Sequence, residues 1–447
     1  MSACILLDSW RGWVAALAGP LHRRLAWRLP VVVTGLALAS GRRTATSWWR
    51  VARIATGLRS YYYFLDAVGR KADAIALVLL RLVAREVLDP KPLLFALDDT
   101  PTKRYGPKVQ GAGIHHNPTP GTAGSKFLYG HNWVTLSRVV RHTHFGVIGL
   151  PLLARLYVRK VDVPRLPEPA KIHFRTKLQQ AAEMLTVMAP GLPKADYRPR
   201  VVVDGAYAKR EFLKPAMRAG LDVVARLRKD AALTDLPPVL PPGAKRGRGR
   251  PPIYGKNAVS LARRAGQKRG WAEVKSTTAS GREVTERFKT FLATWRPAGG
   301  VIRVVILKAK DDSWRAFLST DRDASVESIV QAVHDRWSIE ANYRDLKQVE
   351  RVGEVQLRRV WANVGAFHLG MWVHTLTELW AWKQAASELS DRRDRPWDDA
   401  DRRPSHADRR RALQQAMWRE EYQRLGVPNT ISEKILPLFD RITRLAG

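Results

Sequence analysis

The chain has 447 residues, of which 76 are Lys or Arg and 41 are Asp or Glu, so its formal net charge is +35. An excess of this size is typical of proteins that bind polyanions and predicts DNA or RNA as the partner. Ribosomal and histone-like proteins are usually short and poor in aromatic residues, whereas this chain has 16 Trp and 45% hydrophobic residues. The single cysteine, Cys4, excludes a disulfide framework and a cysteine-based zinc site and fits a reducing cytoplasm.

No segment predicts a membrane partner or export. The apolar run from Leu29 to Ala39 is too short to span a bilayer, and the cleavage site of a signal peptide does not follow it. We therefore expect a cytoplasmic protein.

Residues 1–90 predict a helical domain, because Trp, Leu, Ala and Arg recur at helical spacing with few turn residues. Arg42 and Arg43 precede the pair Trp48 and Trp49, an arrangement of bases and aromatics that suits a DNA-binding helical module. An amphipathic bundle with a solvated basic face explains the same pattern equally well.

Residues 91–229 predict three consecutive strands, followed by two further strands that are each preceded by a helix. The expected strands are PLLFAL ending at Asp98, FLYGHNWVTLSRVV, HFGVIGLPLLARLYV, RVVVD ending at Asp204, and LDVVARLR, with helices at 175–188 and 209–219. Successive strands suit antiparallel pairing, and strands separated by helices suit parallel pairing. An α/β fold with a mixed sheet covered by helices follows.

Residues 230–322 predict a basic, β-rich insertion. The region opens with a run rich in Pro, Gly and basic residues. Three later strand-like runs predict a small sheet of its own, namely EVTERFKTFLATW, VIRVVILKAK and WRAFLST. Its RGRGRPP run places Arg246, Arg248 and Arg250 in a pattern that resembles an AT-hook, whose arginines lie along a narrow minor groove. Ordinary basic linkers also contain such runs.

Residues 323–389 predict a helix that starts just after Asp323, followed by an apolar helix, and residues 390–447 predict a charged linker with C-terminal helices. In the first helix Arg336, Glu340 and Lys347 point within roughly 40° of one another, since each residue turns the helix by about 100°. One helix face then presents an acid between two bases. An exposed set of ion pairs, each worth about 0.2 to 0.5 kcal/mol, would show the same spacing.

Three acids stand at positions that suit metal chemistry. Asp98 and Asp204 follow strands, and carboxylates at strand ends lie where ligands collect on a sheet. Together with Glu340 they would repel one another unless a divalent cation lay between them, and hard oxygen ligands select Mg²⁺ or Mn²⁺. Two such ions can activate water or a 3′ hydroxyl for attack on a phosphodiester. A lone strand-end Asp is more often a turn or capping residue.

The segments FALDDTPTKRYG, VVVDGAY and RWSIEANYRDLK together resemble the DDE catalytic domain of bacterial insertion-sequence transposases, the RNase H-like branch with a Tyr-Arg-Glu-Lys signature. The resemblance covers roughly residues 90 to 385. Arg336, Glu340 and Lys347 match the signature Y-x2-R-x3-E-x6-K in spacing, whereas Val333 stands at the tyrosine position. For the first acid, Asp98 fits the family's strand-Asp-x-Thr pattern, and its neighbour Asp99 would point to the opposite face of the strand.

This resemblance implies an RNase H-like mixed sheet with flanking helices, interrupted by the β-rich insertion. It implies that Asp98, Asp204 and Glu340 are catalytic and bind two Mg²⁺ or Mn²⁺ ions, and that Arg336 and Lys347 hold phosphates beside the scissile bond. The implied activity is cut-and-paste transposition through a hairpin intermediate. The implied partners are double-stranded DNA, as terminal inverted repeats and target, and a second copy of the chain in a synaptic complex on the bacterial nucleoid.

Two other functions remain open at this point. A nuclease or resolvase of the same fold would cut without strand transfer. A catalytically silent, transposase-derived protein would bind the ends without cutting.

Overall fold

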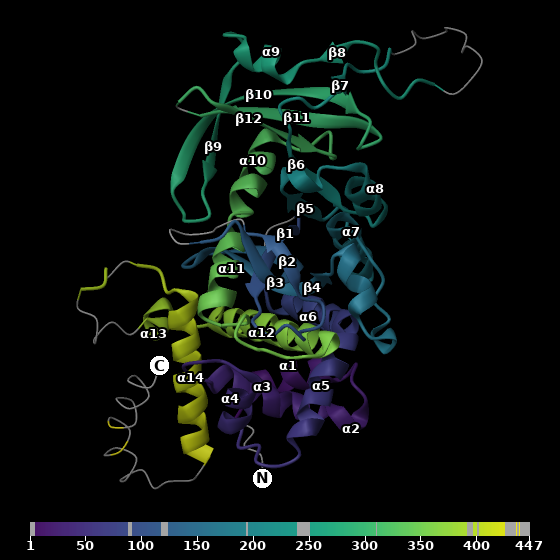
Figure 1. The fold of residues 1–447 in the computed structure, drawn as a ribbon. Coiled ribbons are helices and arrows are strands. Elements are labelled where there is room, and N and C mark those ends of the chain that lie inside the picture. The colour runs from purple at the N-terminus through teal and green to yellow at the C-terminus, as the bar shows by residue number, and fades with distance from the viewer. Residues whose placement is uncertain are drawn as a thin grey trace.

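The computed structural model describes residues 5–87, 92–117, 124–193, 195–238, 251–309, 311–390, 397–399, 402–424, 435 and 438. In these ranges one sheet has the strand order β2-β3-β1-β5-β6-β12-β11-β10-β7-β8, with β4 beside β3 and β9 beside β10 (Figure 1). The strands are β1 Leu94–Lys103, β2 Gly113–His116, β3 Phe127–His142, β4 Gly146–Tyr157, β5 Arg200–Val203, β6 Asp222–Leu227, β7 Leu233–Thr234, β8 Ala258–Val259, β9 Ala272–Thr277, β10 Glu283–Trp295, β11 Gly300–Lys308 and β12 Trp314–Ser319.

Helices cover this sheet and extend beyond it at one end (Figure 1). They are α1 Asp8–Ala18, α2 Arg23–Ala26, α3 Arg28–Leu38, α4 Ala45–Val51, α5 Leu58–Arg70, α6 Ala72–Glu86, α7 Lys177–Met188, α8 Arg210–Arg218, α9 Leu261–Gly266, α10 Val326–Asp335, α11 Ser338–Gln348, α12 Val360–Ala381, α13 Ala386–Leu389 and α14 His406–Arg424.

The sheet is mixed, as the sequence predicts. β1 pairs in parallel with β5, and β5 pairs in parallel with β6. On the other side, β1 pairs antiparallel with β3, and β3 antiparallel with β4. The α/β class and the mixed pairing are therefore confirmed.

Two local expectations about the sheet are wrong. β1 does not end at Asp98 but runs on to Lys103, because β3 continues to pair with it through this stretch. The strands of residues 230–322 do not form a sheet of their own either. β12 pairs antiparallel with β6, so β12, β11 and β10 extend the central sheet. Backbone groups at the free edge of β6 are satisfied by this pairing.

The N-terminal region is helical, as the sequence predicts, and it shares its hydrophobic core with the sheet. The core runs without a break from residues of α1 through α12 to the strands. The helix α12 lies between the N-terminal helices and the sheet (Figure 1) and packs against α5 and β4. A Cβ at Gly365 would lie 2.0 Å from the Leu65 carbonyl oxygen, so only glycine permits the close approach of α5 and α12.

Although α12 is buried along almost its whole length, none of the described helices is long and apolar enough to cross a membrane.

The predicted single helix carrying Glu340 is two helices in the structure. α10 ends at Asp335, α11 begins at Ser338, and Arg336 and Trp337 connect them. The amides of Trp337, Ile339 and Glu340 bond to carbonyls three residues back, as in a 3₁₀ turn. This tight turn leaves the Trp337 side chain 49% exposed.

Candidate active site

The parallel register of β1 and β5 brings the first two acids together. Leu97 of β1 pairs with Val203 of β5, and Asp98 and Asp204 are the next residue on each chain. β5 ends at this point and turns into a short 3₁₀ segment, Gly205–Tyr207. The two acids therefore lie on neighbouring strands at the same level of the sheet, although Asp98 lies inside β1 and only Asp204 follows the end of its strand.

Arg336 connects this pair to the third acid. Its Nη1 donates to Asp98 Oδ2 at 3.0 Å, and its Nη2 lies 3.9 Å from Glu340 Oε1. The Arg336 side chain is largely buried, whereas that of Glu340 is half exposed. The structure therefore places Asp98, Arg336 and Glu340 in one group, with a cation between two carboxylates.

The site concentrates negative charge. Burial raises the pKa of Asp98 to about 6, and the charges of Asp99 and Asp204 add to this effect, while the Asp99 amide and Arg336 oppose it. Burial also raises the pKa of Glu340, where Arg336 opposes the shift and Asp204 adds to it. Asp204 acts on both other acids, so the three carboxylates lie within one another's electrostatic field.

Asp99 belongs to the opposite face of β1, as alternation along a strand requires. Its Oδ2 accepts a hydrogen bond from Lys177 Nζ of α7 at 2.6 Å, and its Oδ1 accepts one from the Tyr207 hydroxyl at 3.3 Å. These partners hold Asp99 away from Arg336, and they favour Asp98 as the acid that faces Glu340.

Two tyrosines beside the acids were missed from the sequence. Tyr207 bonds to Asp99, and Tyr343 shares a 2.7 Å hydrogen bond with Thr135, which lies opposite Asp98 in β3. Burial raises the pKa of both tyrosines above the usual value, so both hydroxyls keep their protons. Each lies three residues after an acid, Asp204 or Glu340, and this spacing is the sequence signal that could have identified them.

The other residues of the predicted signature lie further from the acids or in the core. Lys347 is exposed near the end of α11 and, among the residues that the structure describes, pairs with no carboxylate. Val333 is buried with Ile329 and Val330 in an apolar cluster, so this position serves packing.

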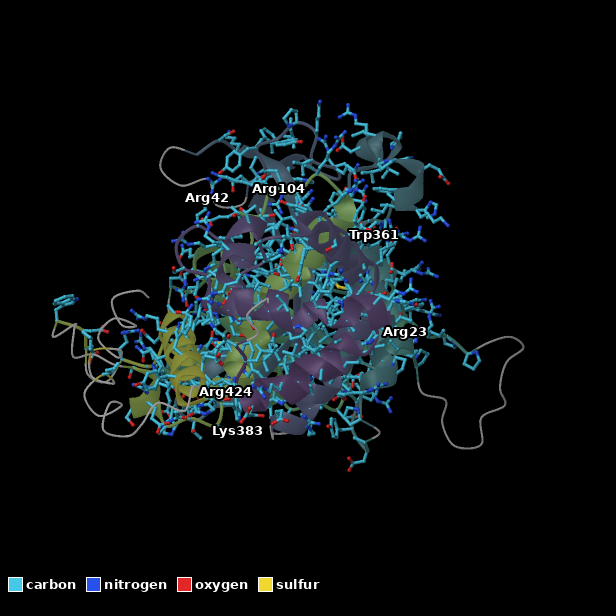
Figure 2. All side chains as sticks on the ribbon, turned by 90° about the horizontal axis from the view of Figure 1, so that it is seen from below. Arg23, Arg42, Arg104, Trp361, Lys383 and Arg424 are labelled. Carbon is cyan, nitrogen blue, oxygen red and sulfur yellow. The ribbon has the colours of Figure 1, made fainter. Side chains whose placement is uncertain are left out.

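The predicted DNA contacts outside the Glu340 helix have different outcomes. Arg42 is exposed, near the edge of the face shown in Figure 2. Arg43 is not available to DNA, contrary to prediction, because it is buried, with its Nη1 3.4 Å from Glu350 Oε2. Arg246, Arg248 and Arg250 lie outside the described residues.

The triad's donor set suits a hard divalent cation. Asp98, Asp204 and Glu340 offer only carboxylate oxygens, which Mg²⁺ and Mn²⁺ prefer. The Arg336 guanidinium already lies between two of these carboxylates, which shows that the place accepts positive charge.

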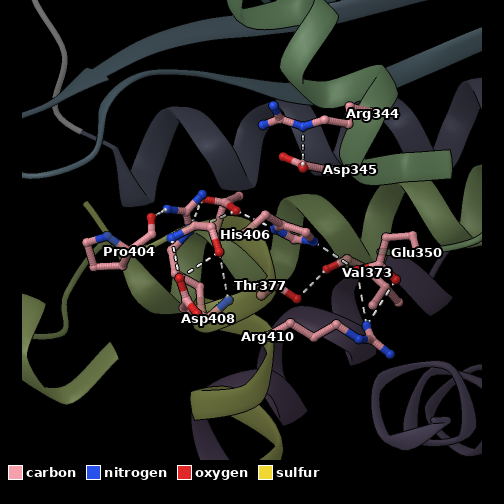
Figure 3. A network of polar contacts seen from close by, with 12 residues as sticks. Arg344, Asp345, Glu350, Val373, Thr377, Pro404, His406, Asp408 and Arg410 are labelled. Atoms are coloured by element: carbon pink, nitrogen blue, oxygen red, sulfur yellow. Dashed lines mark hydrogen bonds and ion pairs between the residues drawn. The ribbon is translucent and has the colours of Figure 1, made fainter. Parts of the chain in front are cut away.

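A second cluster of metal-ligating types lies elsewhere. Within the described ranges, ligand atoms of His374, Glu378 and His406 lie within 4.8 Å of one another, all buried. Both ring nitrogens of His406 bond to carboxylates, however: Nδ1 to Glu378 at 2.5 Å and Nε2 to Glu350 at 2.9 Å. A ring that donates from both nitrogens is an imidazolium with no lone pair for a metal. Figure 3 shows His406 within this network of hydrogen bonds and ion pairs.

Comparison with known proteins supplies the family. A protein-family model described as DDE superfamily endonuclease matches residues 16–296, well over half of the chain. The match ends before Glu340. No curated protein matches. Among solved structures, a piggyBac transposase synaptic complex with hairpin DNA is similar over 97% of this chain and 77% of the other, at 11% identity and a TM-score of 0.37. On the family match, the chain belongs to the DDE superfamily endonucleases.

Proposed function

We propose that the protein is a DNA transposase of an insertion sequence, in which Asp98, Asp204 and Glu340 form the catalytic triad. The observation that supports this proposal most directly is the pairing of β1 with β5, which places Asp98 next to Asp204 while Arg336 links Asp98 to Glu340. The three residues come from segments far apart in the chain, and their convergence suits a shared ligand.

In the proposed reaction, Asp98, Asp204 and Glu340 would hold two Mg²⁺ or Mn²⁺ ions. When bound, these ions would activate the attacking water or 3′ hydroxyl and stabilise the charge that develops on the phosphate. Arg336 offsets part of the negative charge of Asp98 and Glu340, and its planar guanidinium is suited to contact a phosphate beside the scissile bond. Lys347, exposed on the same helix as Glu340, supplies a second positive charge for the DNA backbone.

The route of transposition follows from the sequence resemblance and is part of the proposal. Water attacks at the transposon end, and the freed 3′ hydroxyl attacks the opposite strand to form a hairpin. The hairpin is reopened before strand transfer into target DNA, with two protomers bridging the two ends. Arg42 and the AT-hook-like arginines, Arg246, Arg248 and Arg250, are the proposed contacts with DNA outside the catalytic region.

The test of this function is a cleavage and joining assay. The DNA that flanks the gene would be searched for short inverted repeats, and a duplex bearing one would be incubated with the protein, Mg²⁺ and a target plasmid. We expect cleavage at the repeat end, a hairpin product and joined molecules. Cleavage without joining would instead identify a nuclease or resolvase, and binding without cleavage would identify a silent DNA-binding protein.

The choice between Asp98 and Asp99 is tested by matched substitutions. Asp98→Asn should lower the cleavage rate by about a hundredfold or more, because even residues that only support metal ligands cost about 10- to 100-fold when replaced. Asp99→Asn weakens a partly exposed ion pair with Lys177, so its free energy of unfolding should fall by no more than about 1 kcal/mol. Initial rates and thermal unfolding of both variants provide the measurement. An inactive Asp99→Asn beside an active Asp98→Asn would reverse the assignment.

A further inference from the structure

Two adjacent cavities lie where the loop after β1 meets the start of α12. The first, of about 490 Å³, is lined by the loop 105–114 and by Arg159 and Arg165. The second, of about 420 Å³, is lined by Arg70, Arg358 and the first residues of α12. Gln110 lines both cavities, so they lie side by side, and the two together are called the groove below.

Gln110 fixes the position of this shared wall. Its backbone amide donates to the Arg358 carbonyl at 2.9 Å, and its side-chain Oε1 accepts from the Val360 amide at 3.0 Å. Its own carbonyl bonds to His131 Nε2 at 3.0 Å. The groove is therefore built on the rigid junction between the sheet and α12.

The groove carries a surplus of positive charge. Six basic residues line it, namely Arg70, Lys108, Arg159, Arg165, Arg358 and Arg359, against two acids, Asp66 and Asp162. Arg159 and Arg165 both bond to Asp162, and Arg70 pairs with Asp66.

Two of the basic residues keep their charge uncompensated. Lys108 and Arg358 are exposed and have no acidic partner in the part of the chain that the structure describes. Charges held in this way are available to an anionic ligand, and their removal disturbs no ion pair.

The same strand connects the groove to the triad. β1 carries Asp98, continues to Lys103 and leads into the groove loop at Tyr105, whose side chain is 76% exposed. Seven residues of extended chain cover at most about 23 Å at about 3.3 Å each. On duplex DNA, with about 3.4 Å per base pair, this reach corresponds to about seven base pairs.

We propose that this groove binds backbone phosphates of the duplex, within about seven base pairs of the phosphate held at the triad. The inference rests on the proposed function, because it takes the triad as the site of cleavage. Arginine and lysine contacts to phosphates position DNA without reading its sequence. The groove therefore holds the duplex in register with the triad.

The salt dependence of binding tests this proposal. Fluorescence anisotropy would measure duplex affinity of the full-length protein in Ca²⁺ for the double variant Lys108→Ala/Arg358→Ala. Each phosphate contact contributes about 0.9 to the slope of log affinity against log salt, so losing two should reduce the slope by about 1.8. Between about 50 and 200 mM salt, the variant should lose about tenfold less affinity than the wild type does.

The matched control is Arg23→Ala/Arg81→Ala, which removes two exposed charges on α2 and α6 that pair with no acid among the described residues. Arg23 lies apart from Trp361, a residue of the second cavity, in the view of Figure 2. The control should keep the wild-type slope. Equal slopes of log affinity against log salt in the two double variants would overturn the proposal that the groove binds DNA. Mg²⁺-dependent cleavage by the wild type would still support the proposed triad. A wild-type protein that binds no duplex would overturn both.

Position on the DNA is tested with neutral methylphosphonates placed within about seven base pairs of the scissile phosphate, on either side in turn. On one side they should weaken wild-type binding severalfold and leave the double variant unchanged. An equal loss in both proteins would show that the groove does not contact those phosphates.

Discussion

Glu340→Gln is expected to lower Mg²⁺-dependent DNA cleavage by about a thousandfold or more, because the proposed triad would act as a unit in which each member is required. Glutamine keeps the size of the side chain and removes only its negative charge. Glu340 is half exposed, and its contact with Arg336 is long, at 3.9 Å. The substitution should therefore leave folding unchanged.

Duplex binding measured in Ca²⁺ should stay close to the wild-type value, since the proposed contacts with DNA are made by basic residues. Glu327→Gln is the matched control, because Glu327 is an exposed residue of the preceding helix, α10. It should cleave at the wild-type rate. A Glu340→Gln protein that retains more than a tenth of the wild-type rate would contradict the assignment of the triad.

His406→Leu is expected to lower the free energy of unfolding by about 3 to 5 kcal/mol, the usual cost of breaking a buried ion pair. His406 lies between Glu350 and Glu378 without exposure to solvent. Arg409 and Arg410 complete the network by pairing with Glu378 and Glu350 (Figure 3). Leucine would leave two buried carboxylates without their shared proton donor.

The network joins three distant parts of the chain. Arg410 of α14 also donates to the Leu36 carbonyl at the end of α3, and Glu378 belongs to α12. Loss of His406 should therefore loosen α14 from both helices. Asp230→Asn is the control, because it removes an exposed pair with Arg228 and should change the free energy of unfolding by less than about 1 kcal/mol. A His406→Leu protein as stable as this control would show that the network contributes no stability.

The same network predicts how stability depends on pH. Burial alone would lower the pKa of His406, but its hydrogen bonds to Glu350 and Glu378 outweigh burial and raise this pKa to about 9. The contribution of His406 is therefore complete below its unfolded pKa of about 6.5 and is lost as the pH rises through about 9. For Glu378, burial is outweighed by Arg409 and His406, which lower its pKa to about 2. Its contribution is complete above about 4.5 and is lost as the pH falls toward 2.

Thermal unfolding between pH 4 and pH 9 provides the measurement. The wild type should be most stable between about pH 4.5 and 6.5, where both contributions are complete. The decline between about pH 6.5 and 9 should flatten in His406→Leu, because the titrating group is gone. If stability declined equally in His406→Leu over this pH range, titration of groups other than His406 would be its cause.

Local patterns were sufficient for most of the elements. Apolar runs predicted β3, β4, β5, β6, β10, β11 and β12 within a few residues, and helical periodicity predicted α7, α8 and α12. These patterns reflect backbone geometry and the burial of one face of a helix or strand, and both depend on residues that are close together in the sequence. Short strands such as β2, β7 and β8 were missed because runs this brief carry little periodicity.

The helix break at Arg336 and Trp337 was missed for a different reason. Neither residue is a helix breaker, so composition does not reveal the turn. The buried cluster around Val333 and Ile339 packs against the sheet from α10 and α11, and the break follows from that packing.

What the sequence by itself determined is the set of parts: a basic chain, apolar strands followed by Asp98 and Asp204, and a helix with Glu340 between Arg336 and Lys347. Tertiary structure alone decided which parts meet. The register of Leu97 with Val203 joins the two aspartates, and the contact of Arg336 with Asp98 adds Glu340. The physical reason is that strand register and the pairing of buried charges depend on residues hundreds of positions apart, which no local pattern encodes.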